Sequence, residues 1–472
     1  MPRLGSVDAR FLSYNIEMVE ITGGPFWRPY RPARTSTRSQ SAKPESSGAN
    51  LFEDRTPIDL TNARLRVLAA ALGPAYLRVS GRWANTTYFA DSGRLPAPLP
   101  RGFTGVLTGA QWRHVVAFSQ FADAPIVTSF AAGRGNRDAA GVWRPEQAER
   151  LLGFTRAIGG KLAGVEFINE PDLAAIGGLP RTYDAAAYGR DFKLFHSLIR
   201  RATPGTMILG PATIGETARA ADLLAATAGD LDAVSYHYYP ILSQRCGVRT
   251  APEATLSERW LSGADRALAF YRNLRDRLAH AKPIWVTETA DAACGGNPWG
   301  ATFLDTFRYL DQLGRLARDG VRVVMHNTLV GSDYGLLDET TFAPRPDYWG
   351  ALLWRRMMGP TVLDPGVPGG GGLHLYAHCL RRSRGGVALL AINADRRVAH
   401  AIEVPTAAVR YTLDAASLFG RKVRLNGRAL RMTAGSRLPS MAGAPAGAGT
   451  VKFAPATITF LAMADAGNPA CQ

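Results

Sequence analysis

The feature that most constrains the fold of this chain is a regular alternation of short apolar segments with longer amphipathic ones. The short segments are rich in β-branched and aromatic residues, which is typical of buried strands. Eight strands are expected, at residues 11–17, 75–80, 125–130, 164–170, 206–210, 233–239, 283–288 and 321–327. Amphipathic helices are expected at residues 60–72, 111–121, 145–158, 183–201, 217–226, 258–280, 302–318 and 348–358, and a long polar loop at residues 23–50. This alternation predicts an α/β fold, a (β/α)8 TIM barrel.

The last part of the chain has a different pattern. A stretch rich in proline and glycine at residues 364–372 resembles a linker, and beyond it apolar residues recur at every second position. Asn426-Gly427 is a strong signal for a hairpin turn. With 472 residues, the chain is long enough for two units. We therefore expect a catalytic barrel domain over residues 1–360, whose first residues could join the second unit, and a C-terminal β-sandwich domain over residues 361–472.

The charge of the chain is strongly positive, at +16, and almost all of its cations are arginines. A basic surface suits polyanions, but an arginine-rich genome gives the same composition, so charge alone decides nothing. The arginines are scattered, and no groove-reading nucleic-acid motif accompanies them. No run of 18 apolar residues could span a membrane. We expect a monomer that binds neither nucleic acid nor, stably, a membrane.

The four cysteines, Cys246, Cys294, Cys379 and Cys471, form no C-x-x-C pair, so we expect neither a zinc site nor any other metal or cofactor. Their even number is compatible with two disulfides and weakly favours an oxidising compartment. The first six residues lack the apolar centre of a signal peptide. Either the protein is cytosolic or its export signal is absent from this sequence; we expect a secreted or periplasmic protein.

Two predicted strands, the fourth and the seventh, end on glutamates, Glu170 and Glu288. In a closed barrel both carboxyl groups would face the same mouth, as hydrolysis of a glycosidic bond requires. Asn169 precedes the first glutamate and could hold a sugar hydroxyl. The aromatic run at 236–239 could supply rings and hydroxyls that orient Glu288. The alternative is structural: Glu170 would stabilise a helix beginning at Pro171, and the tyrosines would be core residues.

Several motifs are similar to those of retaining glycosidases with this barrel. Asn169-Glu170-Pro171 resembles an acid/base motif, and the run from Trp285 to Thr289 resembles a nucleophile motif. The stretches at 11–13, 74–78, 304–307, 323–325, 334–339, 346–349 and 376–379 look like the heparanase branch of glycoside hydrolase family 79. The resemblance covers almost the whole chain.

The resemblance implies roles for individual residues. Glu170 would be the acid/base and Glu288 the nucleophile, and Tyr238 matches a tyrosine that hydrogen-bonds the nucleophile. The family holds the uronate carboxylate by backbone N–H groups of a glycine loop and by a tyrosine. Further substrate-binding residues implied by the match are Glu17, Asn169 and Asn327, with the carboxylate loop at Cys294, Gly295 and Gly296 and the tyrosine at Tyr334. A disulfide between Cys379 and Cys471 is implied as well.

Three departures from the family pattern qualify this picture. The long excised segment of the mammalian enzyme corresponds here to about twenty residues, 91–110, so we expect no activation by cleavage. The lysine-rich heparin-binding segments are missing, which puts tight heparin binding and sulfate preference in doubt. Cys294 replaces a glycine in the carboxylate loop, and whether it pairs with Cys246 stays open.

The expected function is that of a retaining endo-β-glucuronidase, which would cleave glucuronate–glucosamine linkages in heparan sulfate or a related acidic polysaccharide. The nearest alternative is an exo-acting β-glucuronidase of the same family. A catalytically inactive polyanion-binding protein is the alternative from another class, and the Glu170/Glu288 pair argues against it.

Overall fold

The computed structural model describes residues 1–30, 51–92, 94–366, 370–433, 435 and 437–472. Most of the loop expected at residues 23–50 therefore lies outside the described residues. Its two flanks form a hairpin, in which β3 (Gly24–Trp27) pairs antiparallel with β4 (Phe52–Arg55).

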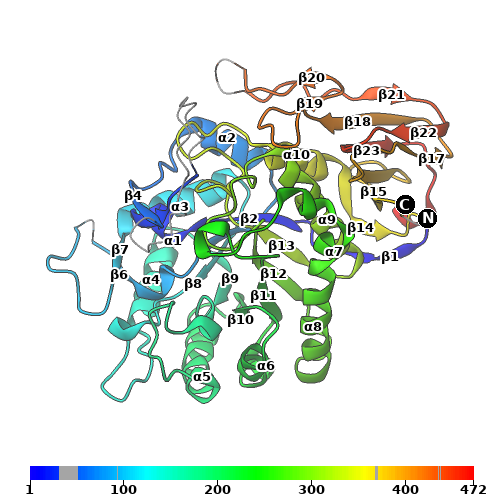
Figure 1. The fold of residues 1–472 in the computed structure, drawn as a ribbon. Coiled ribbons are helices and arrows are strands. Elements are labelled where there is room, and N and C mark those ends of the chain that lie inside the picture. The colour runs from blue at the N-terminus through cyan, green and yellow to red at the C-terminus, as the bar shows by residue number, and fades with distance from the viewer. Residues whose placement is uncertain (31–50, 93, 367–369, 434, 436) are drawn as a thin grey trace.

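The predicted barrel is confirmed. Eight parallel strands close into a ring in the order β10-β11-β12-β13-β2-β5-β8-β9, so the first strand of the barrel pairs with the last (Figure 1). Their bounds are β2 Leu12–Glu17, β5 Leu77–Ser80, β8 Ile126–Ser129, β9 Leu162–Glu166, β10 Met207–Ile214, β11 Ala233–Tyr238, β12 Ile284–Thr289 and β13 Val323–His326.

The helices surround the barrel strands, as Figure 1 shows for α4, α5, α6 and α8. Their bounds are α1 Met18–Thr22, α2 Ala63–Ala71, α3 Gly109–Phe121, α4 Glu146–Ala157, α5 Ala185–Ala202, α6 Ala218–Ala225, α7 Glu258–Leu261, α8 Gly263–Leu278, α9 Phe303–Arg318 and α10 Pro346–Met357. Short parallel strands β6 (Thr87–Ala90) and β7 (Gly105–Thr108) lie in the loop after β5.

One expected helix, at 258–280, is in fact two. The chain breaks at Ser262, between α7 and α8. Gly263 then lies against the barrel, because a Cβ atom at this position would come within 2.4 Å of the Tyr238 hydroxyl. The helical periodicity persists across the break, which explains why the sequence pattern did not reveal it.

The barrel interior is layered from apolar to polar. Its lower layer is an apolar cluster that includes Val127, Leu209, Trp285 and Met325. Above it, toward the carboxyl ends of the strands, the inward side chains become charged, beginning with Arg78 of β5. A TIM barrel places its active site at this carboxyl end.

The C-terminal region is an antiparallel sheet, as predicted, with a second layer formed by a two-stranded ribbon. The sheet runs β1-β14-β15-β16-β23-β18-β19-β20, and β21 pairs with β18. The strands are β1 Arg3–Ser6, β14 Met358–Leu363, β15 Leu373–Leu380, β16 Val387–Asn393, β18 Ala408–Asp414, β19 Arg424–Leu425, β20 Arg428–Ala429, β21 Ala444–Ala446 and β23 Thr457–Met463, and the ribbon is β17 His400–Val404 with β22 Gly449–Phe453. The expected turn at Asn426-Gly427 joins β19 to β20, with positive φ at both residues.

The N-terminal strand β1 belongs to this sheet, where it pairs with β14. In Figure 1 both chain ends lie together at the edge of the sheet. The boundary between residues 360 and 361 stays a prediction, and β14 crosses it.

Both faces of the sheet are covered. The β17–β22 ribbon packs on one face around Leu389, Val451 and Phe453, and helices α9 and α10 contact β14, β15 and β23. Gly314 of α9 permits the close approach, since a Cβ there would fall 2.3 Å from the Tyr376 ring. Burial on both faces explains the continuous apolar run of β16.

Two disulfides join the four cysteines. The predicted Cys379–Cys471 bond ties β15 to the C-terminal turn. The Cys246–Cys294 bond, which the sequence left open, joins the loops that follow β11 and β12.

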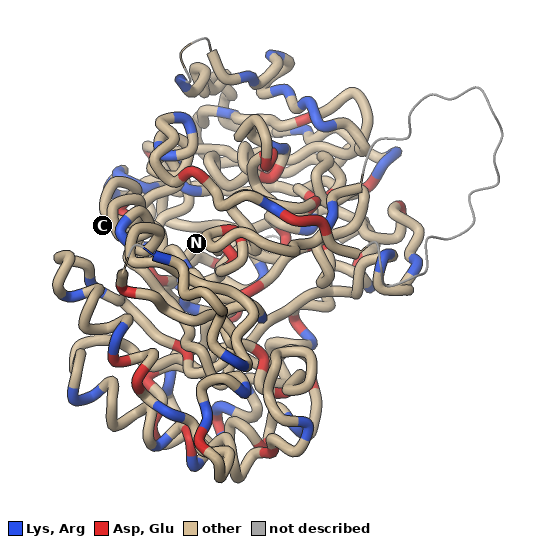
Figure 2. The backbone as a smooth tube through the Cα atoms, turned by 90° about the vertical axis from the view of Figure 1, so that its left-hand side faces the viewer, with Lys and Arg blue, Asp and Glu red and all other residues tan. Residues whose placement is uncertain are grey.

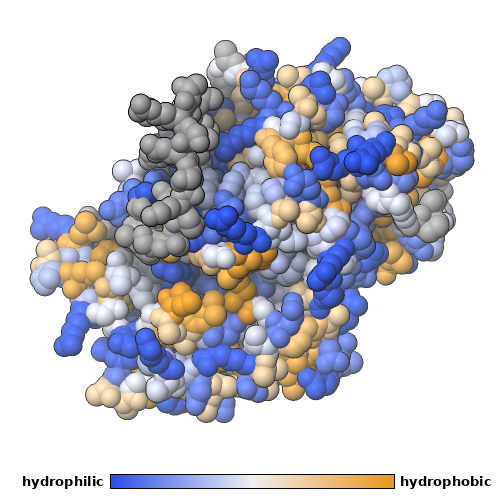
Figure 3. Space-filling view, viewed as in Figure 1, coloured by the Kyte–Doolittle hydropathy of each residue, from blue (hydrophilic) through white to orange (hydrophobic). Residues whose placement is uncertain are grey.

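The surface charge is mixed. Figure 2 shows lysine and arginine spread over both regions and interspersed with acidic residues, without one continuous basic stripe. On the face seen in Figure 3, apolar residues form small patches between hydrophilic ones. Among the helices of the described residues, none has the length and apolar character needed to cross a bilayer.

Candidate active site

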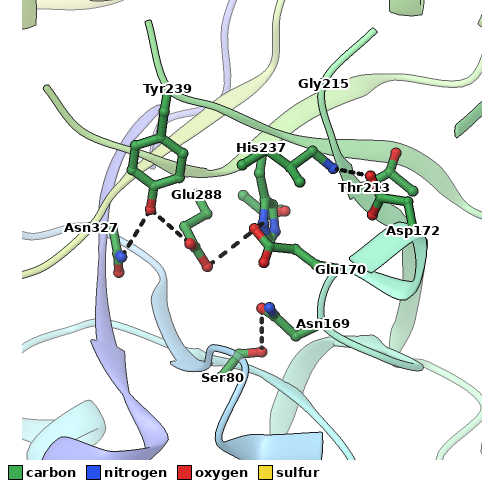
Figure 4. A network of polar contacts seen from close by, with 12 residues as sticks. Ser80, Asn169, Glu170, Asp172, Thr213, Gly215, His237, Tyr239, Glu288 and Asn327 are labelled. Carbon is green, nitrogen blue, oxygen red and sulfur yellow. Dashed lines mark hydrogen bonds and ion pairs between the residues drawn. The ribbon is translucent and has the colours of Figure 1, made fainter. Parts of the chain in front are cut away.

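Glu288 lies at the end of β12 and is held from two sides. Its Oε1 accepts a hydrogen bond from the Tyr239 hydroxyl at 2.7 Å (Figure 4). Its Oε2 accepts one from Nη1 of Arg78 at 2.9 Å. Burial tends to raise the pKa of Glu288, but His237 and Arg78 outweigh burial and hold the pKa below its ordinary value. Glu288 is therefore ionised at neutral pH.

Glu170 reaches the site from a turn rather than from a strand. β9 ends at Glu166, four residues earlier than expected, and Glu170 adopts a left-handed conformation with φ of +50°. Its Oε1 lies 2.9 Å from Nδ1 of His237. Only a three-residue 3-10 turn begins at Pro171, and the Glu170 side chain makes no capping bond to it. The capping alternative therefore does not explain this residue.

The two carboxyl groups face each other across a narrow gap. One oxygen of Glu170, one of Glu288 and one nitrogen of His237 all lie within 4.8 Å of one another. These three side chains are also the ones that could hold a metal ion in the described part of the chain. His237 is buried between the carboxylates; burial lowers its pKa, but Glu288 and Glu170 raise it more.

Arg78 of β5 is the centre of the polar layer beneath these groups, and sequence reasoning missed it. Its guanidinium donates to Glu166 at 2.9 Å, to Glu288 at 2.9 Å and to the Asn169 amide oxygen at 2.8 Å, and lies 3.2 Å from Nε2 of His237. A charged residue inside a fully buried strand was the available signal.

Glu17, at the end of β2, lies on the opposite side of Glu288. Nδ2 of Asn327 donates to Glu17 Oε1 and to the Tyr239 hydroxyl, each at 3.0 Å. Burial, reinforced by the charge of Glu288, raises the pKa of Glu17 to about 8. Its second oxygen is buried without a hydrogen-bond partner among the described residues. Glu17 is thus a protonated carboxyl at neutral pH.

The expected contact between Tyr238 and Glu288 is wrong: Tyr239 makes it. Side chains alternate along β11, so Ser235 and His237 point into the barrel and residue 239 continues on their side. Tyr236 shares the outer face with Tyr238 and stacks on Tyr271 of α8, with ring centroids 4.1 Å apart. Tyr238 accordingly lies beside Gly263 of the same helix.

The predicted carboxylate loop has a backbone suited to anions. Cys294, Gly295 and Gly296 have successive φ values of +66°, +82° and +82°, a conformation in which neighbouring N–H groups can converge. The N–H of Gly296 already donates to the Ala292 carbonyl at 3.2 Å, which leaves the N–H groups of Cys294 and Gly295. The Cys246–Cys294 disulfide fixes one side of this loop.

A cavity of about 460 Å³ collects most of the predicted residues. Those in its wall are Glu17, Asn169, Glu170, Glu288, Cys294, Asn327 and Tyr334. Tyr238, Gly295 and Gly296 are not in its wall. Burial raises the pKa of Tyr334 well above its ordinary value, so its hydroxyl keeps its proton. The wall also contains an aromatic group that the sequence did not suggest: Trp27, Phe52 and Trp83, around Arg82.

Comparison with known proteins agrees with this geometry. Residues 99–314 match the model of glycosyl hydrolase family 79, N-terminal domain. Heparanase-like protein 1 of Arabidopsis thaliana is 29% identical over 72% of this chain, and the alignment spans 65% of that protein. Heparanase of Bos taurus is 25% identical over 90% of this chain and 88% of its own length.

The fold agrees as well. The crystal structure of a 4-O-α-L-rhamnosyl-β-D-glucuronidase from Fusarium oxysporum covers 98% of each chain with a TM-score of 0.68, at 13% identity. The family match over residues 99–314 and the heparanase relatives support a glycosidase that is similar to the heparanase-like members of glycosyl hydrolase family 79.

Proposed function

We propose that the protein is a retaining endo-β-glucuronidase that cleaves glucuronate–glucosamine bonds in heparan sulfate or a related acidic polysaccharide. The carrying observation is the pair of carboxyl groups, with oxygens within 4.8 Å of each other. Oxygens this close are compatible with a retaining enzyme, whose carboxyl groups lie about 5–5.5 Å apart.

The charges around Glu288 support its role as the nucleophile. Arg78 and His237 keep Glu288 ionised, as a nucleophile requires. In the first step a Glu288 oxygen would bond to the anomeric carbon while the glycosidic bond breaks, and Glu170 would give its proton to the leaving oxygen. In the second step Glu170 would take a proton from water, whose oxygen displaces Glu288 from the sugar.

Substrate binding would involve the rest of the cavity. The N–H groups of Cys294 and Gly295, with the Tyr334 hydroxyl, would hold the uronate carboxylate. Asn169 uses its amide oxygen on Arg78 and would keep its amide nitrogen for a sugar hydroxyl. Glu17 and Asn327 would hold further hydroxyls.

Endo action rests on the resemblance to the heparanase branch; the Fusarium glucuronidase shares the fold and favours neither mode of action. We favour endo action because the alignment with bovine heparanase spans nearly the whole of both chains. The two disulfides support a secreted or periplasmic location, because disulfides persist in oxidising compartments.

The test is digestion of heparan sulfate followed by sizing of the products. Oligosaccharides support endo action, and free glucuronate alone would establish the exo alternative. Binding without turnover of any glucuronide would show the inactive polyanion-binding protein instead.

Trapping of the glycosyl group by azide tests which carboxyl group is the acid/base and which is the nucleophile. Glu170→Ala should retain glycosylation of Glu288 when the leaving group needs no proton, and azide should then yield a β-glycosyl azide. An α-glycosyl azide from this variant, or β-azide from Glu288→Ala, would reverse the assignment.

A further inference from the structure

Arg82 follows the end of β5 and lies in the wall of the catalytic cavity. Its guanidinium carbon is 4.8 Å from the Trp83 ring centroid, 5.2 Å from that of Phe52 and 5.6 Å from that of Trp27. The three rings also contact one another, with the Trp27 and Phe52 centroids 4.6 Å apart. We call these four residues the arginine–aromatic cluster.

The guanidinium of Arg82 has no hydrogen bond or ion pair with any described residue. Other cations near the cavity are paired: Arg78 with Glu166 and Glu288, and Arg245 with Asp333. Burial lowers the pKa of Arg82, against the pull of Glu17 and Glu170. A half-buried guanidinium without a hydrogen bond or ion pair to a described residue is unfavourable in the free protein, and an incoming anion would relieve that cost.

The cluster lies beside the proposed uronate-binding loop, in the wall of the cavity that also contains the two carboxyl groups. Trp27 packs against the carboxylate loop, because a Cβ added to Gly295 would fall 2.5 Å from its Cβ. The hairpin β3–β4 carries Trp27 and Phe52, while Arg82 and Trp83 follow β5. The cluster thus forms a wall next to the proposed uronate-binding loop.

We propose that the arginine–aromatic cluster binds an anionic group of the saccharide, a sulfate or a carboxylate, on a sugar next to the one whose bond is cleaved. The planar guanidinium matches the oxygens of either anion in two parallel hydrogen bonds, and the rings offer flat faces to the sugar. The proposal rests on the proposed glycosidase function and adds a specificity determinant to it. One built site of this kind would give anion selectivity without lysine-rich segments.

The test compares kcat/KM of the wild type with Arg82→Gln and Arg82→Lys on oligosaccharides of equal length. One substrate is unsulfated, one is N-sulfated, and one is unsulfated with its non-reacting uronates methyl-esterified. Losing a charge-assisted pair is worth about 10- to 100-fold, so the Gln variant should lower the preference for the preferred anionic substrate by that factor. Arg82→Lys keeps the positive charge but loses the two parallel N–H donors of the guanidinium. Its preference should fall between those of the wild type and the Gln variant.

The substrate series identifies the anion. If sulfate is the ligand, the ratio of N-sulfated to unsulfated kcat/KM falls in the Gln variant; if carboxylate is the ligand, the ratio of unsulfated to esterified falls. Arg397→Gln, which removes an exposed arginine of the C-terminal region, is the matched charge control and should change neither ratio.

Equal effects of Arg82→Gln on all three substrates, or no effect, would overturn the proposal. Melting temperatures identify a misfolded variant, in which case Arg82→Lys decides. If the wild type cleaves none of the substrates, the proposed function fails, and calorimetric titration with the same oligosaccharides still tests the cluster: affinity for the preferred anion must fall in the Gln variant.

Discussion

Two charge clusters in this protein contain similar residues but differ in how their carboxyl groups are paired. At the junction of barrel and sheet, Arg315 of α9 contacts Asp311, Asp265 and Glu258. In the catalytic cavity, Arg78 pairs with Glu166 and Glu288, while Glu17 and Glu170 form no ion pair with an arginine or lysine among the described residues. Each of the three carboxylates in the first cluster pairs with an arginine, whereas in the described part of the chain two carboxyl groups of the second cluster do not.

The difference shows what each cluster is for. Asp311 accepts three bonds, from Arg315, His374 and Tyr376, each at 2.6 Å, and these partners outweigh burial and lower its pKa. Glu17 is equally buried yet has a pKa of about 8 and an oxygen without a partner. The fully bonded carboxylate of Asp311 ties α9 to β15, whereas Glu17 keeps hydrogen-bonding capacity for a ligand.

The sharpest test of this contrast is Glu288→Gln. Without the carboxylate no glycosyl-enzyme can form, so kcat should fall by about 10⁴-fold or more on every substrate. Activity is measured with an aryl glucuronide, and the melting temperature checks that the fold persists. Residual kcat near the wild-type value would remove Glu288 from the mechanism.

Asp311→Asn is the counterpart at the junction. It leaves Arg315 and His374 with a neutral partner in a buried position, and the free energy of unfolding should fall by about 3 kcal/mol. Chemical denaturation measures the loss, and kcat below the transition should stay within about twofold. A large kcat loss with unchanged stability would contradict the contrast.

The free energy of unfolding should depend on pH through the titration of Glu17. Its folded pKa is about 8, above the ordinary value of 4.5, so the folded state holds a proton that the unfolded chain releases. The free energy of unfolding should therefore fall as pH rises between about 5 and 8, by at most about 1.4 kcal/mol per unit. Glu17→Gln should flatten that slope in denaturant titrations, and an unchanged slope would refute the assignment.

Tyr239→Phe tests the corrected tyrosine. Removing the hydroxyl that donates to Glu288 should lower kcat about 10- to 100-fold, since the nucleophile loses a positioning bond. Tyr238→Phe is the matched control, because its ring faces α8, and should remain within about twofold. A large loss of kcat in Tyr238→Phe with little change in Tyr239→Phe would show that Tyr238 is the tyrosine that bonds Glu288.

The smallest effect is expected for Tyr334→Phe. If its hydroxyl holds the uronate carboxylate, KM for glucuronides should rise about five- to tenfold, while β-glucosides change little. Equal changes in KM for both substrates would show that Tyr334 shapes the cavity but does not bind the uronate carboxylate.

The sequence allowed the barrel, both glutamates at its mouth and seven of the nineteen residues in the cavity wall to be predicted, because strand periodicity and strand-end residues are local signals. Tyr239 was within reach too: Ser235, His237 and Tyr239 share one parity, and knowing that His237 points inward would have selected it. Arg78 was quoted in a motif but received no role, since only three dimensions show that it meets both Glu166 and Glu288.

The arginine–aromatic cluster lay beyond sequence reasoning for a different reason. Its rings come from both sides of the segment at residues 31–50 and from the loop after β5, and no period links such positions. The turn that carries Glu170 was missed because apolar residues continue past the end of β9 and imitate a longer strand.

The pairing of β1 with β14 bears on how this chain is made. Ser6 lies opposite Thr361 in the register of the sheet. During synthesis the first strand leaves the ribosome long before its partner exists, whereas the barrel helices and strands can assemble nearly in order. β1, at the edge of the C-terminal sheet, therefore cannot pair with β14 until almost the entire barrel has been translated. The two regions can therefore join only late in synthesis. In a ribosome-bound chain shorter than about 360 residues, β1 has no native partner and could pair with another strand edge.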